Sequence, residues 1–425
     1  MNAPPSRPIL DTRLPSGLRL VVEPLDHVRS VAVGVWVTTG SRHEPDELLG
    51  VSHFLEHVVF KGTARRSAKA IARAIDAVGG QLDAFTGREM ACYYAKVLDE
   101  LLPEALDLLS DILADPVLNP EDIERERRVI LEEIKLAEDT PAEDVFDLFY
   151  AAIFDGHPLG RPVIGTPGTV GRLQRDELVA WRASHIFAEN LLIAISGSCR
   201  PEEVADAVGH AFSFPAENHR SAPAPGTSSG RRLMVKEKGS EQVHLCLGFP
   251  SVNDASPRRY VASVLSAIVG GGVASRLFQR VREEEGLAYA VHSFLDLFSD
   301  AGAMGIYAGV SPDEVVKVLA VIGQELQSVA HHGVQPDELT LAKVQFKGQM
   351  TLALEDTSNR MSRLAKQMIT FGRHWTLEES LAMVDAVSLD DVQALARELF
   401  VPSNYCLAVI GPIAQEVLEA RWPLE

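Results

Sequence analysis

Hydrophobic and polar residues alternate along two short stretches near the start of the chain, residues 18–22 and 31–37. A period of two is typical of β-strands, because successive side chains of a strand point to opposite faces of its sheet. Two similar stretches, residues 232–236 and 242–249, lie just after the middle of the chain. Each pair is followed by longer apolar segments of helical character. The pattern predicts that each half of the chain begins with strands and continues with helices.

A second pattern is shared by the two halves. In each, an apolar helix is followed by a turn that contains Pro and an acid, and then by another helix; the turns are at 119–122 and 335–338. A faint repeat of about 200 residues implies two duplicated α+β domains. A stretch rich in Pro, Gly and Ser near the middle predicts an extended linker. We therefore expect an N-terminal domain over residues 1–216, a linker over 217–230 and a homologous domain over 231–425.

The most informative segment is residues 50–63, which contains the sequence His-Phe-Leu-Glu-His. On a helix, His53, Glu56 and His57 share one face, because positions i, i+3 and i+4 are neighbours. Two neutral imidazoles at this spacing can hold a zinc ion, and a carboxylate beside the metal can act as a general base. His-x-x-Glu-His is a zinc peptidase signature, reversed relative to His-Glu-x-x-His. The segment predicts a catalytic zinc site.

An ordinary helix that happens to carry two histidines is the alternative interpretation. The hydrophobic flanks argue against it, since they make the helix apolar on most sides and predict that it is buried. Buried imidazole and carboxylate groups are costly unless they are paired, and one metal ion satisfies all three groups at once. The flanking hydrophobic residues are Val51, Phe54, Leu55, Val58 and Val59.

A third zinc ligand must come from elsewhere, because catalytic zinc usually has three protein ligands and one open position. The candidate is a helix predicted for residues 119–135, which has an Asn-Pro start and an acidic first turn. Glu126 and Glu133 lie near one face of this helix, since seven residues make almost two turns. Two carboxylates on a partly apolar face favour a bound cation. An ordinary charged helix is the alternative.

Composition narrows the class of protein. The chain has 425 residues, 46% of them hydrophobic, and a formal net charge of −19. This length and composition predict a globular protein of two or more domains, and the charge argues against nucleic-acid binding. The chain shows no run of 18 apolar residues and no secretory signal, so we expect a cytoplasmic protein without a membrane partner. Scattered cysteines predict buried thiols in a reducing compartment. The cysteines are Cys92, Cys199, Cys246 and Cys406.

Several motifs in the same order resemble the pitrilysin/insulinase family of zinc peptidases (M16). Within it, they resemble the branch of the mitochondrial processing peptidase β-subunit and its bacterial homologues. The resemblance implies an α+β protein of two homologous domains, each a mostly antiparallel sheet flanked by helices, of the LuxS/MPP-like metallohydrolase type. The matching segments are His53-Phe54-Leu55-Glu56-His57 with Phe60-Lys61-Gly62-Thr63, residues 79–86, 157–160, 270–279 and 281–289.

The resemblance also assigns roles to residues of the first half. It implies that His53, His57 and Glu133 hold one Zn²⁺ per chain, with Glu133 at the family's spacing after the second His. It implies that Glu56 is the general base and that Glu126 is a supporting acid of the site.

In the second half, the resemblance places Arg282 and Tyr289 on the carbonyl of the substrate, where a guanidinium and a phenol can stabilise developing negative charge. Without the resemblance, Arg282 would be read as a surface charge and Tyr289 as a core strand residue. A loop, Gly270 to Gly272, either touches substrate flexibly or forms a turn that needs positive φ, and we favour the turn.

The resemblance further implies that a peptide is laid along an exposed strand edge, which binds an extended chain through backbone hydrogen bonds. Many relatives have Asn where this chain has Asp83, a change that keeps the backbone role and puts an amide contact to substrate in doubt. The candidate substrate-binding residues are Asp83, Ala84, Phe85 and Thr86.

Together these features predict a zinc metalloendopeptidase, an inverzincin, that cuts short or unfolded peptides, and the resemblance implies that it does so inside a closed dimeric chamber. We expect a homodimer, because one chain carries both the zinc motif and the Arg/Tyr pair; a heterodimer with a related subunit is the alternative. Two other functions stay open. One is a non-catalytic structural subunit of a larger complex, like the core proteins of the respiratory bc1 complex. The other is a zinc enzyme with non-peptide chemistry.

Overall fold

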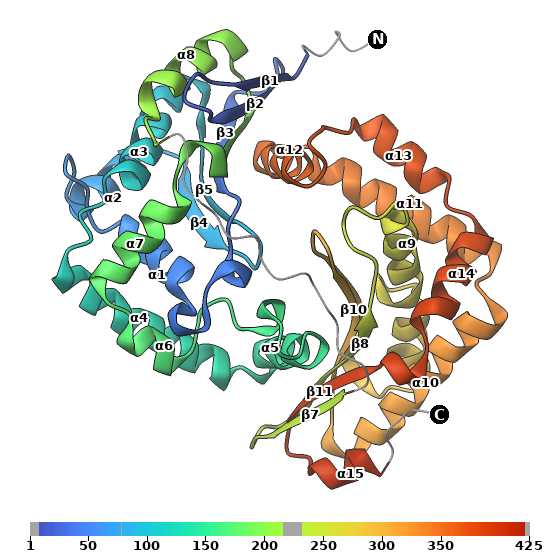
Figure 1. The fold of residues 1–425 in the computed structure, drawn as a ribbon. Coiled ribbons are helices and arrows are strands. Elements are labelled where there is room, and N and C mark those ends of the chain that lie inside the picture. The colour runs from blue at the N-terminus through green and yellow to red at the C-terminus, as the bar shows by residue number, and fades with distance from the viewer. Residues whose placement is uncertain (1–7, 78, 216–231, 421–425) are drawn as a thin grey trace. The chain divides into compact units, whose positions relative to one another are not determined.

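The computed structural model describes residues 8–77, 79–215 and 232–420, which form two compact units (Figure 1). The predicted linker, 217–230, lies outside the described residues. Unit 1 takes its residues from Met1–Ile134, Pro162–Pro223 and Leu352–His374; unit 2 takes its residues from Lys135–Arg161, Ala224–Thr351 and Trp375–Glu425.

Unit 1 is built on a six-stranded sheet with the strand order β1-β2-β6-β3-β5-β4. Only β2 and β6 pair in parallel; the other neighbours are antiparallel. β4 is an edge strand. The strands are β1(Leu10–Arg13), β2(Arg19–Pro24), β3(Ser30–Val37), β4(Gln81–Thr86), β5(Ala91–Leu98) and β6(Leu191–Gly197). The helices are α1(Val51–Val59), α2(Ala68–Ala77), α3(Leu102–Ala114), most of α4(Pro120–Asp139), α6(Pro167–Arg172), α7(Arg175–His185), α8(Pro201–Ala211) and α12(Thr357–Phe371).

Unit 2 repeats this topology without the first strand. Its five-stranded sheet has the order β7-β11-β8-β10-β9, again with one parallel pair, β7 and β11, and antiparallel neighbours elsewhere. The duplicated α+β fold that the strand and helix patterns predicted is therefore confirmed. The strands are β7(Arg232–Glu237), β8(Val243–Pro250), β9(Ala288–Leu297), β10(Gly302–Val310) and β11(Cys406–Gly411). The helices are α5(Pro141–Ile153), α9(Arg259–Gly270), α10(Val315–His332), α11(Pro336–Ala353, less its last residues), α13(Leu377–Asp385), α14(Leu389–Leu399) and α15(Gln415–Glu419).

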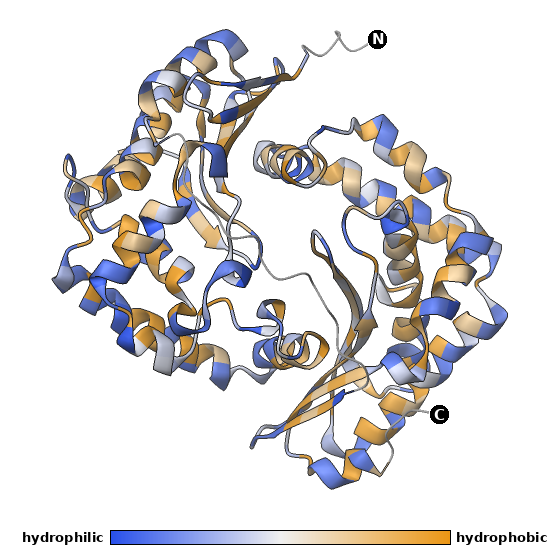
Figure 2. Cartoon of the chain, viewed as in Figure 1, coloured by the Kyte–Doolittle hydropathy of each residue, from blue (hydrophilic) through white to orange (hydrophobic). Residues whose placement is uncertain are grey.

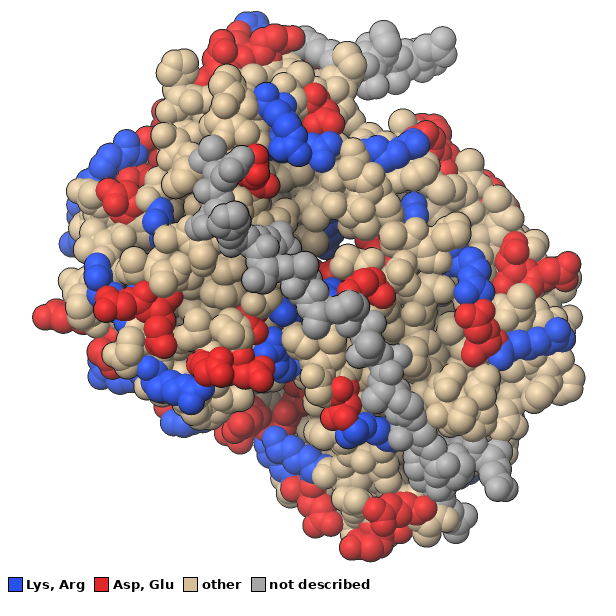
Figure 3. All heavy atoms as spheres, viewed as in Figure 1, with Lys and Arg blue, Asp and Glu red and all other residues tan. Residues whose placement is uncertain are grey.

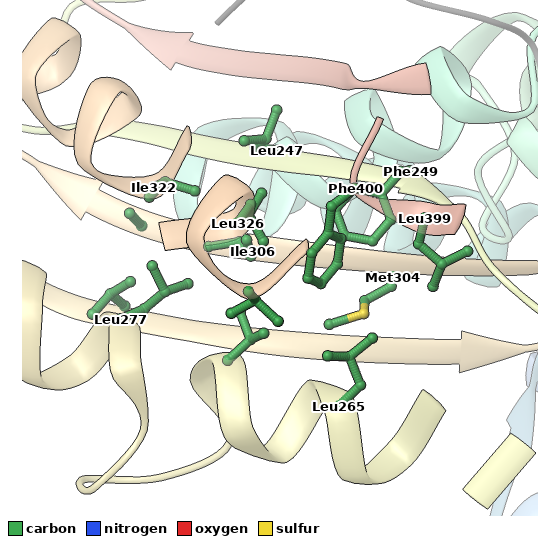
Figure 4. Close-up of a cluster of buried hydrophobic side chains, with 14 of the residues drawn as sticks. Leu247, Phe249, Leu265, Leu277, Met304, Ile306, Ile322, Leu326, Leu399 and Phe400 are labelled. Carbon is green, nitrogen blue, oxygen red and sulfur yellow. The ribbon is translucent and has the colours of Figure 1, made fainter. Parts of the chain in front are cut away.

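The main core of each unit lies between its sheet and a layer of helices. In unit 2 the side chains between the sheet and α9, α10 and α14 interdigitate (Figure 4). The strands β8, β10 and β11 are largely hydrophobic along their length (Figure 2), because both faces of this sheet are covered. Cys92, Cys246 and Cys406 are buried free thiols, as predicted, whereas Cys199 is half-buried.

The second face of each sheet is covered by a helix from the other half of the sequence. Helix α12 packs on β3 and β6 of unit 1, and α5 packs on β8 and β11 of unit 2 (Figure 1). The compact units thus differ from the contiguous ranges 1–216 and 231–425. Close approach explains glycines in two strands: a Cβ on Gly34 would lie 2.5 Å from Met361 Sδ, and one on Gly248 would lie 2.6 Å from the Phe149 ring.

Truncating the face of α12 that meets the unit 1 sheet is expected to destabilise that unit. Leu364 is 1% exposed in a cluster with Trp36 and Met361, so Leu364→Ala should lower the free energy of unfolding by about 2–5 kcal/mol. Chemical denaturation would measure this loss. The matched control is Leu352→Ala at a site that is 73% exposed, where a change within about 0.5 kcal/mol is expected. Equal effects of the two substitutions would contradict the exchanged packing.

The turn predicted at Gly270 to Gly272 is wrong. Gly270 is the last residue of α9, Gly271 has a φ of −82°, and none of the three is among the described glycines with positive φ. Close packing explains them instead: a Cβ on Gly270 would lie 2.4 Å from the backbone nitrogen of Ser293, and one on Gly271 would lie 2.6 Å from Ala267 Cα. These glycines let α9 and the segment after it approach their neighbours.

Candidate metal centre

The helix α1 is held at its N-terminus by a buried carboxylate. Gly50, the N-cap, has a φ of +92°, and its N–H donates to Glu44 Oε2 at 2.7 Å. The N–H of Ser52 donates to Glu44 Oε1 at 2.8 Å. The negative charge of Glu44 also interacts favourably with the positive end of the helix dipole. The helix buries six of its residues, as its apolar flanks predicted, and this fixes the direction in which its polar face points.

His53, His57 and Glu133 form the one cluster of potential metal ligands detected in the described residues. Their ligating atoms all lie within 4.8 Å of one another. His57 Nε2 is 3.4 Å and His53 Nε2 is 3.9 Å from Glu133 Oε2, and the two imidazole centroids are 4.7 Å apart. Helix α1 thus supplies both histidines from consecutive turns, and α4 supplies the carboxylate.

This donor set fits zinc. Ligands about 2.0–2.1 Å from a tetrahedral zinc ion lie about 3.3 Å from one another, close to the spacings observed. Burial, followed by the charge of His57, lowers the pKa of His53 to about 4, so its imidazole is neutral near pH 7, as ligation requires. The Nδ1 atom of His53 is buried and has no hydrogen-bond partner. The carboxylate of Glu133 keeps part of the cluster open to solvent, with 41% of its side chain exposed.

Glu126 lies behind His57. Its Oε2 is 3.4 Å from His57 Nδ1, and its Oε1 is 2.9 Å from Lys61 Nζ. If Nε2 of His57 ligates the metal, Nδ1 carries the proton and donates to Glu126, an arrangement that orients ligating histidines in many metal sites. Lys61 balances the charge of this buried carboxylate. Sequence reasoning gave Lys61 no role, and only its closeness in the fold reveals one.

Neutralising Glu126 is expected to weaken zinc binding without removing a ligand. Glu126→Gln should raise the Kd for zinc by about 10–100-fold, because the acceptor that orients His57 loses its charge. Competition with a chromophoric chelator would measure the Kd. Glu132→Gln removes one charge from an exposed position of the same helix and should leave the Kd unchanged. A Glu126→Gln protein with wild-type affinity would refute this supporting role.

Glu56 stands beside the two histidines on α1, where it accepts a hydrogen bond of 2.5 Å from the hydroxyl of Thr86 on β4. Burial raises the pKa of Glu56; the hydrogen bond from Thr86 and the charge of His57 oppose this, and nearby carboxylates support it. The net pKa lies above the ordinary value, so the ionised form is a stronger base than an exposed glutamate. The contact also ties the candidate base to the predicted substrate strand.

The predicted substrate strand is β4, and β5 is its one pairing partner among the strands that the structure describes, so the other edge of β4 is unpaired among them. Side chains alternate along it: Asp83 and Phe85 are exposed, whereas Ala84 and Thr86 are half-buried. The geometry therefore provides an exposed strand edge in direct contact with Glu56.

Arg282 and Tyr289 are neighbours in unit 2. Arg282 lies in a π-helical segment, Phe278–Glu284, and Tyr289 lies near the start of the edge strand β9. The guanidinium carbon of Arg282 is 5.1 Å from the centroid of the Tyr289 ring, which is a cation–π contact. Tyr289 is 79% exposed, so it is not a core residue. Both side chains are thus available to a ligand.

The surface charge and the hydrophobicity of the helices bear on the kind of partner that this protein can bind. On the face drawn in Figure 3, acidic and basic side chains are interspersed. Among the helices described, none has both the length and the apolar character that crossing a membrane requires.

Comparison with known proteins assigns the family. A model described as Insulinase (Peptidase family M16) matches residues 19–167, and one described as Peptidase M16 inactive domain matches residues 172–346. A Mycobacterium leprae protein named uncharacterized zinc protease is 41% identical over 410 residues, covering 95% of this chain and 92% of the relative. YmxG of Bacillus subtilis, which bears the same description, is 39% identical over 397 residues, covering 93% and 97%. The chain belongs to peptidase family M16, as its motifs predicted.

Solved structures agree on the fold. A protease from Helicobacter pylori superposes with a TM-score of 0.89 at 20% identity, covering 95% of this chain and 99% of the other. A chain of complex III2 from Candida albicans superposes with a TM-score of 0.84 at 21% identity, covering 96% and 97%. At these identities the two structures support the two-domain architecture and carry no functional assignment.

Proposed function

We propose that this protein is a zinc-dependent metalloendopeptidase that hydrolyses short or unfolded peptides. The observation that carries the proposal is the convergence of three ligating atoms beside a half-buried carboxylate, Glu56, that contacts Thr86 of the edge strand β4. Relatives named zinc proteases support it.

His53, His57 and Glu133 would hold one zinc ion per chain. When bound, zinc supplies Lewis acidity, which lowers the pKa of a coordinated water and polarises a carbonyl. Glu126 keeps the His57 imidazole oriented by accepting the Nδ1 proton, and Lys61 forms an ion pair with Glu126.

Glu56 moves the protons of the reaction. Its raised pKa suits removal of a proton from the attacking water, and the same carboxyl then returns the proton to the leaving amine. The Thr86 hydroxyl donates to Oε2 and holds the carboxylate in one orientation, so that Oε1 can take the proton. One carboxyl group can therefore act first as base and then as acid while the C–N bond breaks.

The edge of β4 would bind the peptide. Backbone hydrogen bonds to a strand edge require an extended chain and depend little on its sequence, so folded proteins are poor substrates. Arg282 and Tyr289 would donate hydrogen bonds to the scissile carbonyl oxygen as it gains charge.

We further propose that two chains form a homodimer with a closed chamber, in which the Arg/Tyr pair of one chain or its partner completes each zinc site. The reason is that a single chain carries both the ligand cluster and the Arg/Tyr pair. A heterodimer with a related subunit is the alternative, and a measurement of oligomeric mass separates the two.

Mass spectrometry of a mixed peptide pool tests the activity directly. The purified protein should contain about one zinc per chain and produce internal cleavages, which a chelator abolishes and added zinc restores. A folded protein that contains the same sequences should stay intact. Protein that holds no zinc and cuts no peptide would instead support a non-catalytic structural subunit. Bound zinc without cleavage of any peptide in the pool would support non-peptide chemistry.

A further inference from the structure

An acidic side chain lies beside a pair of aromatic side chains on β4 and β5, the last two strands of the unit 1 sheet. Asp83 and Phe85 are two residues apart on β4 and therefore point to the same face, opposite to Thr86. Tyr94 of β5 pairs directly with Asp83. The Phe85 and Tyr94 ring centroids are 6.4 Å apart with an interplanar angle of 58°. The carboxylate and the two rings form a cluster that we call the acid–aromatic cluster.

The cluster is held in place by its neighbours. The N–H of Ala84 donates to Asp83 Oδ1 at 2.8 Å, and the Tyr94 hydroxyl lies 3.5 Å from Oδ2. Phe85 packs edge-on against the buried Trp36, with ring centroids 5.6 Å apart. These contacts hold the three side chains in place, while the cluster remains accessible to solvent: Asp83 is exposed, and the Phe85 residue is 38% exposed.

Asp83 has no cation of its own. Among the residues that the structure describes, no basic side chain makes an ion pair with Asp83, whereas Lys96, the nearest lysine along β5, pairs with Asp356. A positive charge brought to Asp83 would therefore meet a carboxylate without an ion-pair partner and two aromatic rings nearby.

This combination of groups recognises cations. A carboxylate accepts charge-assisted hydrogen bonds from guanidinium or ammonium groups, and the faces of Phe and Tyr attract a cation held over them. Arginine suits both at once, because its planar guanidinium can stack on a ring while it hydrogen-bonds to a carboxylate. An unflanked acid would attract a cation only weakly, since water screens exposed ion pairs.

We propose that Asp83, Phe85 and Tyr94 bind a basic side chain, arginine or lysine, of the peptide that lies along β4. The inference rests on the proposed function, because it takes the β4 edge as the place of the substrate. The inference goes beyond the proposed function because it assigns substrate specificity to these residues. A strand edge alone accepts any extended sequence, whereas the acid–aromatic cluster selects peptides with a positive charge at one position.

Binding of matched peptides to the Glu56→Gln protein, in which cleavage should be slow, tests the proposal. An N-acetylated neutral peptide series carries one Arg at successive positions, and a second series carries uncharged citrulline at the same positions. At one position the Arg peptide should bind about 10-fold more tightly than its citrulline partner, and Asp83→Asn should abolish that difference between the two peptides. Asp76→Asn, an exposed acid on α2 of the same unit, is the matched control and should keep the full preference.

The aromatic half of the cluster has its own test. Phe85→Leu keeps an apolar side chain but removes the ring, so it should reduce the Arg preference in part, by a factor smaller than Asp83→Asn. Fluorescence anisotropy of labelled peptides gives each Kd.

Three results would overturn the proposal: no preference for Arg at any position, a preference that survives Asp83→Asn, or a preference that Asp76→Asn abolishes equally. A free-amino series distinguishes the source of the cation. If a free N-terminus binds tightly and an internal Arg does not, the cluster binds a terminal ammonium and the side-chain assignment is wrong. Failure of the proposed function is separate, because it appears as the absence of zinc-dependent cleavage by the wild-type protein, whatever the binding data show.

Discussion

Peptide hydrolysis by the Glu56→Gln protein should be about 10²–10⁴-fold slower than by the wild type, with zinc content unchanged. Glutamine preserves the size of the side chain and can still contact Thr86, but it cannot accept a proton from water. Glu56 is not one of the three clustered ligands, so the metal should stay. The initial rate of cleavage of a fluorogenic peptide, measured beside zinc content by plasma mass spectrometry, checks both parts.

The control for this prediction is Glu47→Gln, an exposed acid shortly before α1, which should cut at the wild-type rate. Full activity of Glu56→Gln would exclude Glu56 as the base. Loss of zinc together with activity would mean that Glu56 supports the metal and would leave its proton transfer undemonstrated, so zinc retention is part of the expected result.

His57→Ala should reduce bound zinc from about one per chain to near zero and abolish peptide cleavage. His57 supplies an imidazole whose Nε2 lies 3.4 Å from the Glu133 carboxylate, and without it two ligands remain, too few to retain the ion against a chelator. The substitution also removes the imidazole that Glu126 contacts. Zinc analysis after dialysis, with circular dichroism to verify folding, measures the outcome.

The matched substitution is His210→Ala on α8, an exposed histidine outside the cluster, which should keep both zinc and activity. A folded His57→Ala protein that still holds one zinc per chain would show that the ion binds elsewhere. Restoration of cleavage in His57→Ala by added imidazole would strengthen the assignment, because a small ligand can fill the vacated position.

Local patterns predicted much of the fold. Period-two segments became β2, β3, β7 and β8, and the similar halves became two sheets of the same strand order. The Asn-Pro start before α4 is observed, with Asn119 Oδ1 accepting from the N–H of Glu121 at 3.0 Å. Such features follow from neighbouring residues in the chain, which is why a sequence reveals them.

The hydrophobic pattern of the sequence did not indicate that α5, from the first half of the chain, packs on the unit 2 sheet, or that α12, from the second half, packs on the unit 1 sheet. Both helices look like ordinary amphipathic segments of their own halves, and nothing in their residues states which sheet they cover. The choice is made by packing: Met361 of α12 fills the space above Gly34 and meets Trp36 Nε1 at 3.3 Å. Gly270 and Gly271 illustrate the same limit, since a glycine needed for close approach cannot be told from a turn glycine by sequence alone.

The sequence by itself determined the His53–Glu56–His57 face, because helical spacing is a property of the backbone, and it assigned the family through motif order. Only the tertiary structure decided that the Glu133 carboxylate meets the two imidazoles, that Lys61 balances Glu126, and that Thr86 holds Glu56. These contacts join α1 to α4 and β4, segments distant along the chain. Their geometry is set by how the core packs, and no local rule contains it.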